Sequence, residues 1–536
     1  METTMKRVSI IALTATALTT GTAYAQGGRG GGGGWTTSRA DAQRTAWVRT
    51  DTAISVEGVQ KPDFGLQWTV KVGHTPRETL SEGVSGNTAQ LDPSPGNVTG
   101  SANNLYAYEI DTGTIAWTKH FDAPAPTAST AACPGGMTGG VTRATSLAAN
   151  VAGTTLGGRG GGRGATGGVG APGEGVPMSL FSRGGRGGSG GRGGVAGFSG
   201  GGFAGGGFGG GAAGASGRGG GGAGINRPGP GASYALSSDG VLHTIGQSQG
   251  RELKKPVPFL PANANATDLI LVGETIFTST VNNCGGVANG VWALDLTDGT
   301  VHSWKSEVSP VGAVALSSEG TLYVAIGEGT GRFHDSIVAL DPKTLAVKDW
   351  FATTSPFSSA PVIFPQGGRE LVAAATKDGR IFLLDAMSLG GADHKAALAT
   401  SAATTTSKAW SPSALATWED GAHDRWLLIP AIGAGSGIVA LKVTGTALQQ
   451  AWTSPVLSAP SPPIVVNGVV FALNSGMAAS PAVLHALDGA TGKEIWNSGQ
   501  TIKSFVKSAG LWSISGQVYV ATNDATIYAF GTPMGR

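Results

Sequence analysis

The sequence has few cysteines, few charged residues and no long hydrophobic run. Only two cysteines, Cys133 and Cys284, occur in 536 residues, which excludes a small domain held together by several disulfides. No stretch after the N-terminal residues reaches the roughly 18 consecutive apolar residues of a membrane-spanning helix, so a multispan membrane protein is excluded. The 91 glycines lack the strict period of three that collagen requires. We therefore expect a large chain with ample material for a core.

Much of the glycine surplus lies in one segment. Residues 151–230 hold 38 of the 91 glycines, together with seven arginines and a single acidic residue, Glu174. The segment resembles arginine- and glycine-rich nucleic-acid-binding tracts, but it has few aromatic residues and the rest of the chain is mildly acidic. We therefore predict a disordered, flexible surface insertion, and no nucleic-acid partner.

The N-terminus has the pattern of a secretory signal peptide. Lys6 and Arg7 precede an apolar stretch from Val8 to Ala17, and Ala23-Tyr24-Ala25 supplies the small residues of a cleavage site. A retained anchor is the alternative, but this stretch is too short to span a membrane. We predict a signal peptide at 1–25, a glycine-rich linker at 26–34, and a periplasmic or secreted protein without a membrane span.

A short apolar strand, a turn and then a tryptophan recur along the chain. Val291-Trp292-Ala293-Leu294-Asp295 leads to Trp304, Ile337-Val338-Ala339-Leu340-Asp341 to Trp350, and Leu484-His485-Ala486-Leu487-Asp488 to Trp496. With the strand from Leu105 to Glu109 and weaker copies at 241–246, 381–385, 438–442 and 527–531 there are eight copies. Their spacing is 43 to 57 residues, except for the first interval, which contains the glycine-rich segment.

Each repeat has the content of one four-stranded unit. A second apolar strand precedes the marked one, and turns such as Lys377-Asp378-Gly379 join the two as a hairpin. Four-stranded units of about 40 to 50 residues are typical of propeller blades. The sequence predicts an all-β, eight-bladed propeller over 35–536, with 141–147 as the first strand of its second blade. Leu66–Val70 is expected to close the ring by pairing with the strand around Tyr528.

Six tryptophans occupy the outermost-strand position of their repeats. The interpretation we favour is that their rings pack between neighbouring blades rather than contact a ligand. The six are Trp68, Trp117, Trp304, Trp350, Trp452 and Trp496.

The repeat resembles the PQQ-like repeat of quinoprotein propellers. Leu487-Asp488-Gly489-Ala490-Thr491-Gly492-Lys493-Glu494-Ile495-Trp496 is the best copy, and Trp35 to Arg44 followed by Leu66 to Val70 looks like the start of those domains. The resemblance covers roughly 35–536 apart from the insertion. It implies the fold but leaves the function open.

Two kinds of function follow from the resemblance. Quinoprotein dehydrogenases bind pyrroloquinoline quinone (PQQ) and Ca²⁺ on the propeller axis, under a ring formed by two adjacent cysteines. Propellers of the BamB type keep the repeat, bind no cofactor and contact partner proteins. This sequence has neither an adjacent cysteine pair nor a haem-attachment Cys-x-x-Cys-His motif. No cofactor is certain, and PQQ with Ca²⁺ stays open.

The two cysteines are expected on the same face of the propeller. Cys133 lies in the connection that enters the second repeat, and Cys284 lies between the second and third strands of the third. Both kinds of loop share one face, so we predict a disulfide; two separate buried thiols are the alternative. Closing so long a loop would stabilise the fold by roughly 4 to 5 kcal/mol.

The same face carries the candidate site residues. Cations that converge on the axis would suit the three carboxylates of PQQ, although turn structure alone would also explain several of these residues. The cofactor-binding candidates are Arg332, Lys377, Lys408, Lys507 and Asn283. His334 and Asp335 have the parts of a proton-transfer pair and are the catalytic candidates. The eight histidines have no zinc-ligand spacing, so no metal site is predicted beyond what the resemblance implies.

The functional prediction is a propeller that serves as a scaffold in the cell envelope. Its partner would be an envelope protein or a small-molecule ligand. The alternative is a PQQ-dependent dehydrogenase of alcohols or sugars, so whether the chain is an enzyme stays open at this point.

Overall fold

The computed structural model describes twelve segments of the chain. They are 35–49, 51, 53–72, 84–85, 97–101, 103–123, 130, 132–145, 231–404, 412–432, 436–507 and 510–533. Of residues 84–85, 97–101 and 145 only the backbone is described. Two units, Met1–Ala152 with Ala223–Arg536 and Gly153–Gly222, make up the chain, and the second lies outside these segments. So do the predicted signal peptide (1–25), the linker (26–34) and all of the predicted insertion (151–230).

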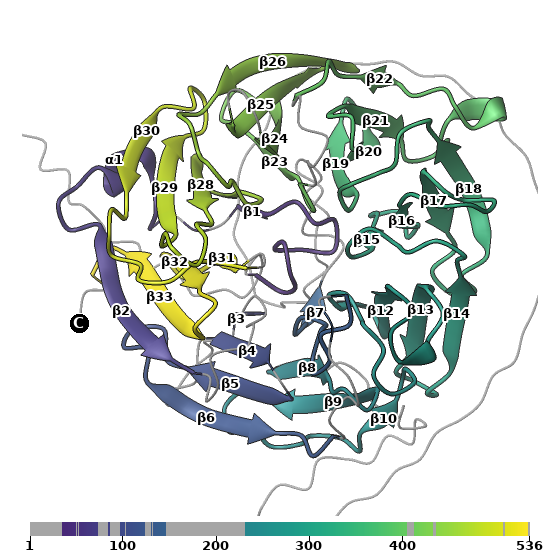
Figure 1. The fold of residues 1–536 in the computed structure, drawn as a ribbon, viewed down its shortest axis with the longest axis horizontal. Helices are drawn as coiled ribbons and strands as arrows, with labels where there is room; N and C mark the ends of the chain where they lie inside the picture. Colours follow the sequence, from purple (N-terminus) through teal and green to yellow (C-terminus); the bar gives the residue numbers. More distant parts are fainter. Residues whose placement is uncertain are drawn as a thin grey trace, which may run out of the picture. The chain divides into compact units, whose positions relative to one another are not determined.

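The described part is almost entirely β-structure, arranged as sheets around a ring (Figure 1). The first two sheets in chain order contain β3 (Val84–Ser85), β4 (Asn97–Ser101), β5 (Asn104–Tyr108) and β6 (Ile115–His120), then β8 (Ala232–Leu236), β9 (Val241–Gly246) and β10 (Val257–Pro258). The third contains β7 (Ala144–Thr145), β11 (Ile270–Val272), β12 (Thr275–Thr280), β13 (Gly290–Asp295) and β14 (Val301–Lys305). The fourth contains β15 (Ala315–Leu316), β16 (Leu322–Ile326), β17 (Ser336–Leu340) and β18 (Val347–Ala352).

Four further sheets complete the ring. They contain β19 (Val362–Gln366), β20 (Arg369–Ala375), β21 (Ile381–Asp385) and β22 (Ala399–Thr400); β23 (Ala416–Glu419), β24 (Arg425–Ala431), β25 (Gly437–Thr444) and β26 (Ala447–Thr453); β1 (Trp47–Val48), β27 (Ile464–Val466), β28 (Val469–Asn474), β29 (Val483–Asp488) and β30 (Glu494–Asn497); and β31 (Leu511–Ile514), β32 (Gln517–Ala521), β33 (Thr526–Gly531) and β2 (Gly65–Lys71). The only helical elements described are α1 (Val56–Val59) and the 3-10 turns Cys284–Gly286 and Gly391–Asp393. None is long and apolar enough to cross a membrane.

Each complete blade is an antiparallel meander whose strands follow one another from the axis outward. In the sheet β15–β18, for example, β15 pairs with β16, β16 with β17 and β17 with β18. Chain reversal in such a meander places the connections between blades and the loops between second and third strands on one face. We call this the disulfide face, and the face with the other turns the opposite face.

The ring is closed by the N-terminal strand, as predicted. Strand β2 pairs antiparallel with β33, with Thr69 opposite Tyr528, so strands from both ends of the described chain share one sheet. Closure of this kind satisfies the backbone groups of an edge that would otherwise be open. The helix α1 precedes β2, and its N-cap is Ser55, whose Oγ accepts a hydrogen bond from the backbone N–H of Gly58 at 3.0 Å.

The predicted number of blades is wrong. Within the described residues the propeller has seven complete blades and not eight. Each complete blade has four antiparallel strands, to which β1 or β7 adds a parallel fifth in two of them, whereas the sheet β8–β10 that follows the first blade has only three strands. The predicted first strand of this sheet, 141–147, is also wrong: Ala144–Thr145 forms β7 and pairs parallel with β11 of the next sheet. Among the described residues 141–145, only an isolated bridge between Thr142 and Tyr234 pairs with β8.

The glycine-rich segment accounts for this difference. It separates β7 from β8 in the chain, so the first strand is not tied to its sheet by the short hairpin that the blades from β11 onward have. The repeat spacing predicted a normal unit because the second and third strands of this sheet, β8 and β9, keep the common pattern. Counting the repeats therefore counted an incomplete sheet as a blade.

The outer tryptophans pack between blades, as predicted. Trp68 donates from Nε1 to the Ile110 carbonyl, Trp117 to that of Gln247 and Trp452 to that of Gly489, each in the next sheet of the ring, at 2.6, 2.7 and 3.1 Å. A left-handed glycine lies against each of these rings. A β-carbon built on Gly113, Gly250 or Gly492 would come within 2.7 Å of the ring of Trp68, Trp117 or Trp452. Glycine is required there by both backbone and space.

A segment that has no counterpart in the repeat lies at the axis of the ring. Residues 35–48, which we call the axial segment, are mostly buried, and Trp35 is fully so (purple at the centre of Figure 1). Backbone carbonyls at 42, 43, 45 and 46 accept hydrogen bonds from four inner strands in ring order. The donors are the N–H groups of Leu316, Ile363, Thr417 and Val465. The axial segment thus joins four consecutive blades.

This winding path requires unusual backbone conformations. Arg39, Ala40, Arg44 and Ala46 have φ between 56° and 75°, a left-handed region that costs an L-residue about 1 to 2 kcal/mol. The hydrogen bonds to the blades offset this strain.

Candidate functional site

Two buried arginines hold the axial segment to the centre of the ring. Arg44 donates from Nε to the Val314 carbonyl at 3.0 Å, from Nη1 to that of Ser38 at 2.7 Å and from Nη2 to that of Asp268 at 3.0 Å. Arg39 donates from Nη2 to the carbonyls of Leu415 and Pro463 at 3.1 and 2.6 Å. Both guanidinium groups are therefore engaged with backbone carbonyls of four blades.

A second cationic cluster lies where the axial segment leaves the inner strands. The guanidinium groups of Arg49 and Arg425 both pack on the ring of Trp47, at 4.5 and 5.6 Å from its centroid. Arg425 is 1% exposed and donates from Nη2 to Glu419 at 2.5 Å. Burial lowers the pKa of Arg425 to about 10, and the nearby Glu419 carboxylate opposes that shift. Because these contacts join β1, β23 and β24, the cluster fixes the end of the axial segment.

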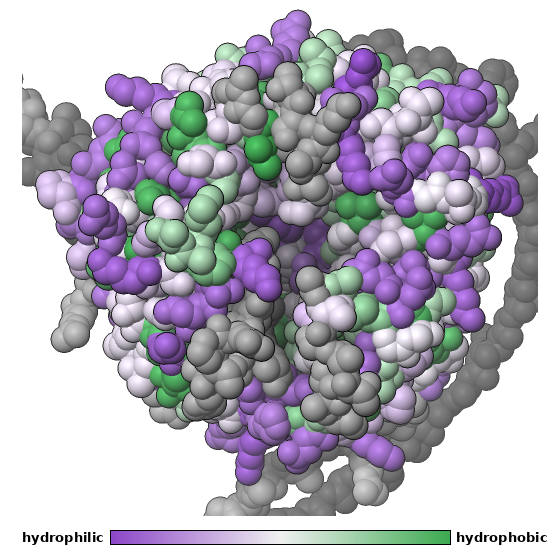
Figure 2. Space-filling model, in the orientation of Figure 1, coloured by the Kyte–Doolittle hydropathy of each residue, from purple (hydrophilic) through white to green (hydrophobic). Residues whose placement is uncertain are grey.

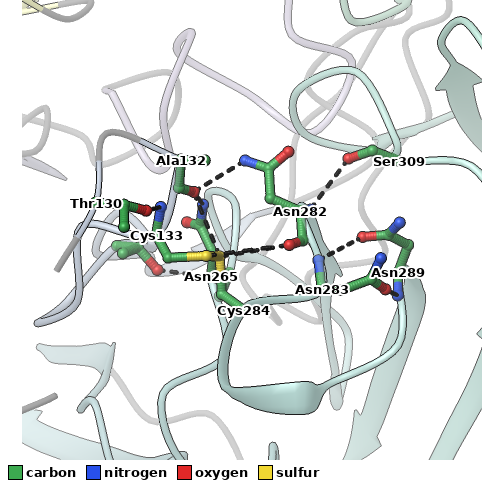
Figure 3. Close-up of a disulfide and its surroundings, with 11 residues drawn as sticks. Thr130, Ala132, Cys133, Asn265, Asn282, Asn283, Cys284, Asn289 and Ser309 are labelled. Atoms are coloured by element: carbon green, nitrogen blue, oxygen red, sulfur yellow. Dashed lines mark hydrogen bonds between the residues drawn. A yellow bond between two sulfur atoms is a disulfide. The ribbon is translucent and has the colours of Figure 1, made fainter. Parts of the chain in front are cut away.

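The two cysteines form the predicted disulfide. Their Sγ atoms are 2.04 Å apart, and the bond joins the connection before β7 to the loop after β12 on the disulfide face. The carbonyl of Ala132 accepts from Nδ2 of Asn265 and of Asn282, both at 3.0 Å (Figure 3). The bond and these amides hold the two loops in one arrangement.

Asn283, a predicted cofactor ligand, forms a reciprocal pair within its loop. Its N–H donates to Oδ1 of Asn289 at 3.0 Å, and its own Oδ1 accepts from the N–H of Asn289 at 3.2 Å (Figure 3). This side chain stabilises the loop beside Cys284.

A pocket adjoins the disulfide loop on the same face. Its volume is about 390 Å³, and it lies between the sheets β15–β18 and β19–β22. Lys377 and Glu328 form an ion pair across it at 2.8 Å. The neighbouring loop reaches it through Ser309, whose Oγ accepts from the N–H of Asn282 at 3.3 Å (Figure 3). The lining residues are Ser309, Pro310, Val311, Gly327, Glu328, Phe357, Ser358 and Lys377.

Hydrogen bonding and the neighbouring ammonium group both act on Glu328. Lys377 lowers the pKa of this carboxyl below its ordinary value, first through the hydrogen bond and then through its charge. The pocket therefore presents a pair of opposite charges next to the apolar side chains of Val311 and Phe357. Sequence reasoning found Lys377 but missed Glu328 and Ser309, because nothing in the repeat marks positions that meet only across two blades.

The other predicted residues have separate environments. The Arg332 guanidinium packs over the rings of Phe333 and Trp350, at 5.1 and 5.0 Å, and Trp350 belongs to the outermost strand β18. Lys507 is exposed in the connection between β30 and β31. Lys408 lies outside the described residues. The predicted cations that the structure describes thus lie in separate loops, and they do not converge on one ligand site.

His334 and Asp335 are in contact, as the proton-transfer prediction requires. Nδ1 of His334 lies 3.0 Å from Oδ2 of Asp335, in the loop that joins β16 to β17. Asp335 has a left-handed backbone, with φ of 50°, and its N–H and carbonyl bond to the backbone of Gly327 and Thr353. These contacts shape the loop, and a catalytic role for the pair stays a prediction.

The described residues do not fit the cofactor that the resemblance implies. PQQ carries three carboxylates, which require several converging cations. Here Arg39 and Arg44 bond to backbone carbonyls, Lys377 pairs with Glu328, and Arg332 packs on Trp350. Among the described residues, no group of three or more His, Cys, Asp or Glu side chains could hold a metal ion. We therefore derive no reaction step through PQQ or Ca²⁺.

Figure 2 shows the surface around the ring in the orientation of Figure 1. Hydrophilic residues are spread over the visible face among paler and hydrophobic ones, and a hollow lies near the centre. The geometry defines a β-propeller with a disulfide-linked loop surface.

Comparison with solved structures confirms the predicted resemblance. A quinohemoprotein alcohol dehydrogenase, ADHIIG from Pseudomonas putida HK5, is 11% identical with a TM-score of 0.52, over 94% of this chain and 81% of that one. A europium-containing methanol dehydrogenase is 10% identical with a TM-score of 0.53, over 93% and 98%. BamB from Moraxella catarrhalis is 12% identical with a TM-score of 0.44, over 87% and 97%.

At these identities the likeness concerns the fold alone. The structural neighbours include PQQ quinoprotein dehydrogenases and BamB, both PQQ-like-repeat propellers. No family model matches the chain, and no curated protein matches it by sequence.

Proposed function

We propose that this chain is an exported propeller that binds a protein or small-molecule partner through its disulfide face. The observation that carries the proposal is the set of loops fixed around Cys133–Cys284, which continue through Asn282 and Ser309 to the Lys377–Glu328 pocket. A surface ordered before binding loses less conformational entropy when a partner binds. The same residues show no converging set of cations for PQQ, which favours binding over quinoprotein catalysis.

Location in the periplasm or outside the cell belongs to this proposal. A structural disulfide is typical of oxidising compartments, and the pattern of Lys6, Arg7 and Ala23 to Ala25 supports export. The BamB neighbour makes a protein partner the first choice to test.

Photo-crosslinking in the periplasm tests the binding role. A benzophenone amino acid replaces Ser309 on the disulfide face or, as the control, Met387 in the turn after β21 on the opposite face. We expect discrete adducts from position 309 and none from 387. Equal labelling from both positions would contradict a specific surface.

A second measurement tests the enzyme alternative. The purified protein is incubated with PQQ and Ca²⁺, and bound cofactor absorbance and dye reduction with alcohols and aldoses are recorded. We expect neither. Stoichiometric cofactor with substrate-dependent dye reduction would replace the proposal with a dehydrogenase.

A further inference from the structure

Part of the disulfide face is formed by loops without charge. Between Arg425 and Asp488 the chain contains one Asp, Glu, Lys or Arg residue, Lys442, which pairs with Asp424. Three loops in this stretch lie on the disulfide face: the one after β24, the connection from β26 to β27 and the one after β28. We call their described residues, 432, 436, 454–463 and 475–482, the uncharged loop surface.

Hydrogen bonds join these loops into one surface. The N–H of Leu457 donates to the Ser436 carbonyl at 3.1 Å, which links the first loop to the second. The N–H of Ser475 donates to the Ala459 carbonyl at 2.8 Å, which links the second to the third. Five prolines (Pro455, Pro460, Pro462, Pro463 and Pro481) further restrict the backbone.

Large apolar side chains protrude from this surface. Val456 is 75% exposed and Met477 63% exposed, and Ala478 and Ala479 beside Met477 are exposed as well. Elsewhere on the same face the pocket carries Glu328 and Lys377. Protein interfaces are depleted of charge at their centre and polar at their rim, which is the pattern of the uncharged loop surface.

A cation borders the surface on one side. The N–H of Val506 donates to the Ser475 carbonyl at 2.9 Å, so the adjacent Lys507 lies next to the loop that carries Met477. Lys507 is exposed, and no carboxylate among the described residues forms an ion pair with it. A partner with an acidic group at that edge would complement this charge.

We propose that the uncharged loop surface docks an apolar, uncharged segment of a partner protein that carries a carboxylate at the Lys507 edge. The proposal rests on the binding role above and assigns it a place and a partner chemistry. Burial of Val456 and Met477 supplies the affinity, at about 25 cal/mol for each Å² of apolar surface removed from water. Lys507 supplies orientation. A symmetric contact between two copies would bring two Lys507 groups to the interface without a carboxylate, so a different partner fits better.

Binding of two labelled peptides tests the proposal on the full-length protein. One probe is a nonapeptide of alternating leucine and serine that ends in two glutamates, and the other ends in two lysines. Fluorescence anisotropy is expected to show tighter binding of the glutamate peptide. Val456→Asp and Met477→Asp should each weaken it about tenfold, equivalent to about 1.4 kcal/mol.

Two variants make the assignment specific. Met387→Asp is the matched control, since Met387 is 76% exposed on the opposite face, and it should leave binding unchanged. Lys507→Glu should reverse the preference between the two peptides while preserving the unfolding midpoint. Equal weakening by Met387→Asp, or an unchanged preference in Lys507→Glu, would overturn the proposal.

Remaining outcomes separate this proposal from the general binding role. Adducts from position 309 without peptide binding would retain a binding role and reject this surface. Failure of both experiments would reject both. Dimerisation of the wild type that Val456→Asp abolishes would assign the surface to a second copy of this chain instead.

Discussion

The centre and the rim of the ring join neighbouring blades in different ways. At the rim, Trp68, Trp117 and Trp452 make the same contact, a ring on a left-handed glycine with a hydrogen bond to a turn carbonyl. At the centre, the axial segment contacts four consecutive blades, each through a different residue. Repeated contacts follow from a repeated sequence, whereas the axial contacts depend on one segment that passes several blades. Loss of an axial contact should therefore affect several blades at once.

The disulfide is the strongest single link, and its removal should have the largest effect. The Cys133→Ser/Cys284→Ser variant should lose about 4 to 5 kcal/mol, because the bond closes a loop of 151 residues in the unfolded chain. Denaturant unfolding with and without dithiothreitol measures the loss. The unfolding midpoint of the reduced wild type should equal that of the variant, and the midpoint of the variant should be the same with and without dithiothreitol. Identical midpoints for oxidised and reduced wild type would refute this ranking.

Arg44 should be the most important side chain at the centre. Arg44→Met keeps the apolar stem but leaves the carbonyls of Val314, Ser38 and Asp268 without these donors. We expect a loss of about 3 kcal/mol, since buried carbonyls that lose charged donors are costly. The control is Arg251→Met at an exposed position, with little expected change. Similar losses in both variants would show that the axial segment contributes little.

A comparison of two glycines measures how much the glycine–tryptophan contact at the rim contributes to stability. Gly492 and Gly445 both have left-handed φ, but only Gly492 lies against a ring, that of Trp452. Gly445→Ala should cost about 1 kcal/mol from backbone strain alone. Gly492→Ala should cost about 2 kcal/mol more, since the added carbon displaces the indole. Equal effects, measured by chemical denaturation, would mean that the ring contact adjusts without cost.

Relief of backbone strain in the axial segment should give a small gain in the free energy of unfolding, in contrast to the losses expected for the variants above. Ala40 has φ of 75°, so Ala40→Gly relieves strain in the folded state while raising the entropy of the unfolded chain. The net expectation is a gain of about 0.5 kcal/mol, read as a higher thermal midpoint. Destabilisation by this variant would indicate that the methyl group's packing outweighs the strain.

The repeat made most of the blades predictable. The apolar strands at the marked positions are β13, β17 and β29 in the structure, and their spacing in the sequence was enough to predict Cys133 and Cys284 on one face. The blade count failed for a local reason. Periodicity records the strands that are present in each unit, but it cannot show that the first strand of one unit pairs with another sheet, as β7 does with β11.

The candidate site was less predictable because it depends on pairs of loops. Lys377 was identified by residue type alone, whereas its partner Glu328 comes from a different blade, 49 residues away. The axial arginines were also missed in this role, although Arg39 and Arg44 both lie in a short segment before the first repeat. Their function depends on carbonyls contributed by four separate blades.

The sequence by itself determined the strand repeat, the inter-blade tryptophans, the ring closure by β2 and the pairing of the two cysteines. These features follow from local periodicity and from the two faces that a meander creates. Tertiary structure alone decided the number of complete blades, the path of the axial segment and the position of the uncharged loop surface beside Lys507. Each of these depends on contacts between residues far apart in the chain, and such contacts leave no period in the sequence.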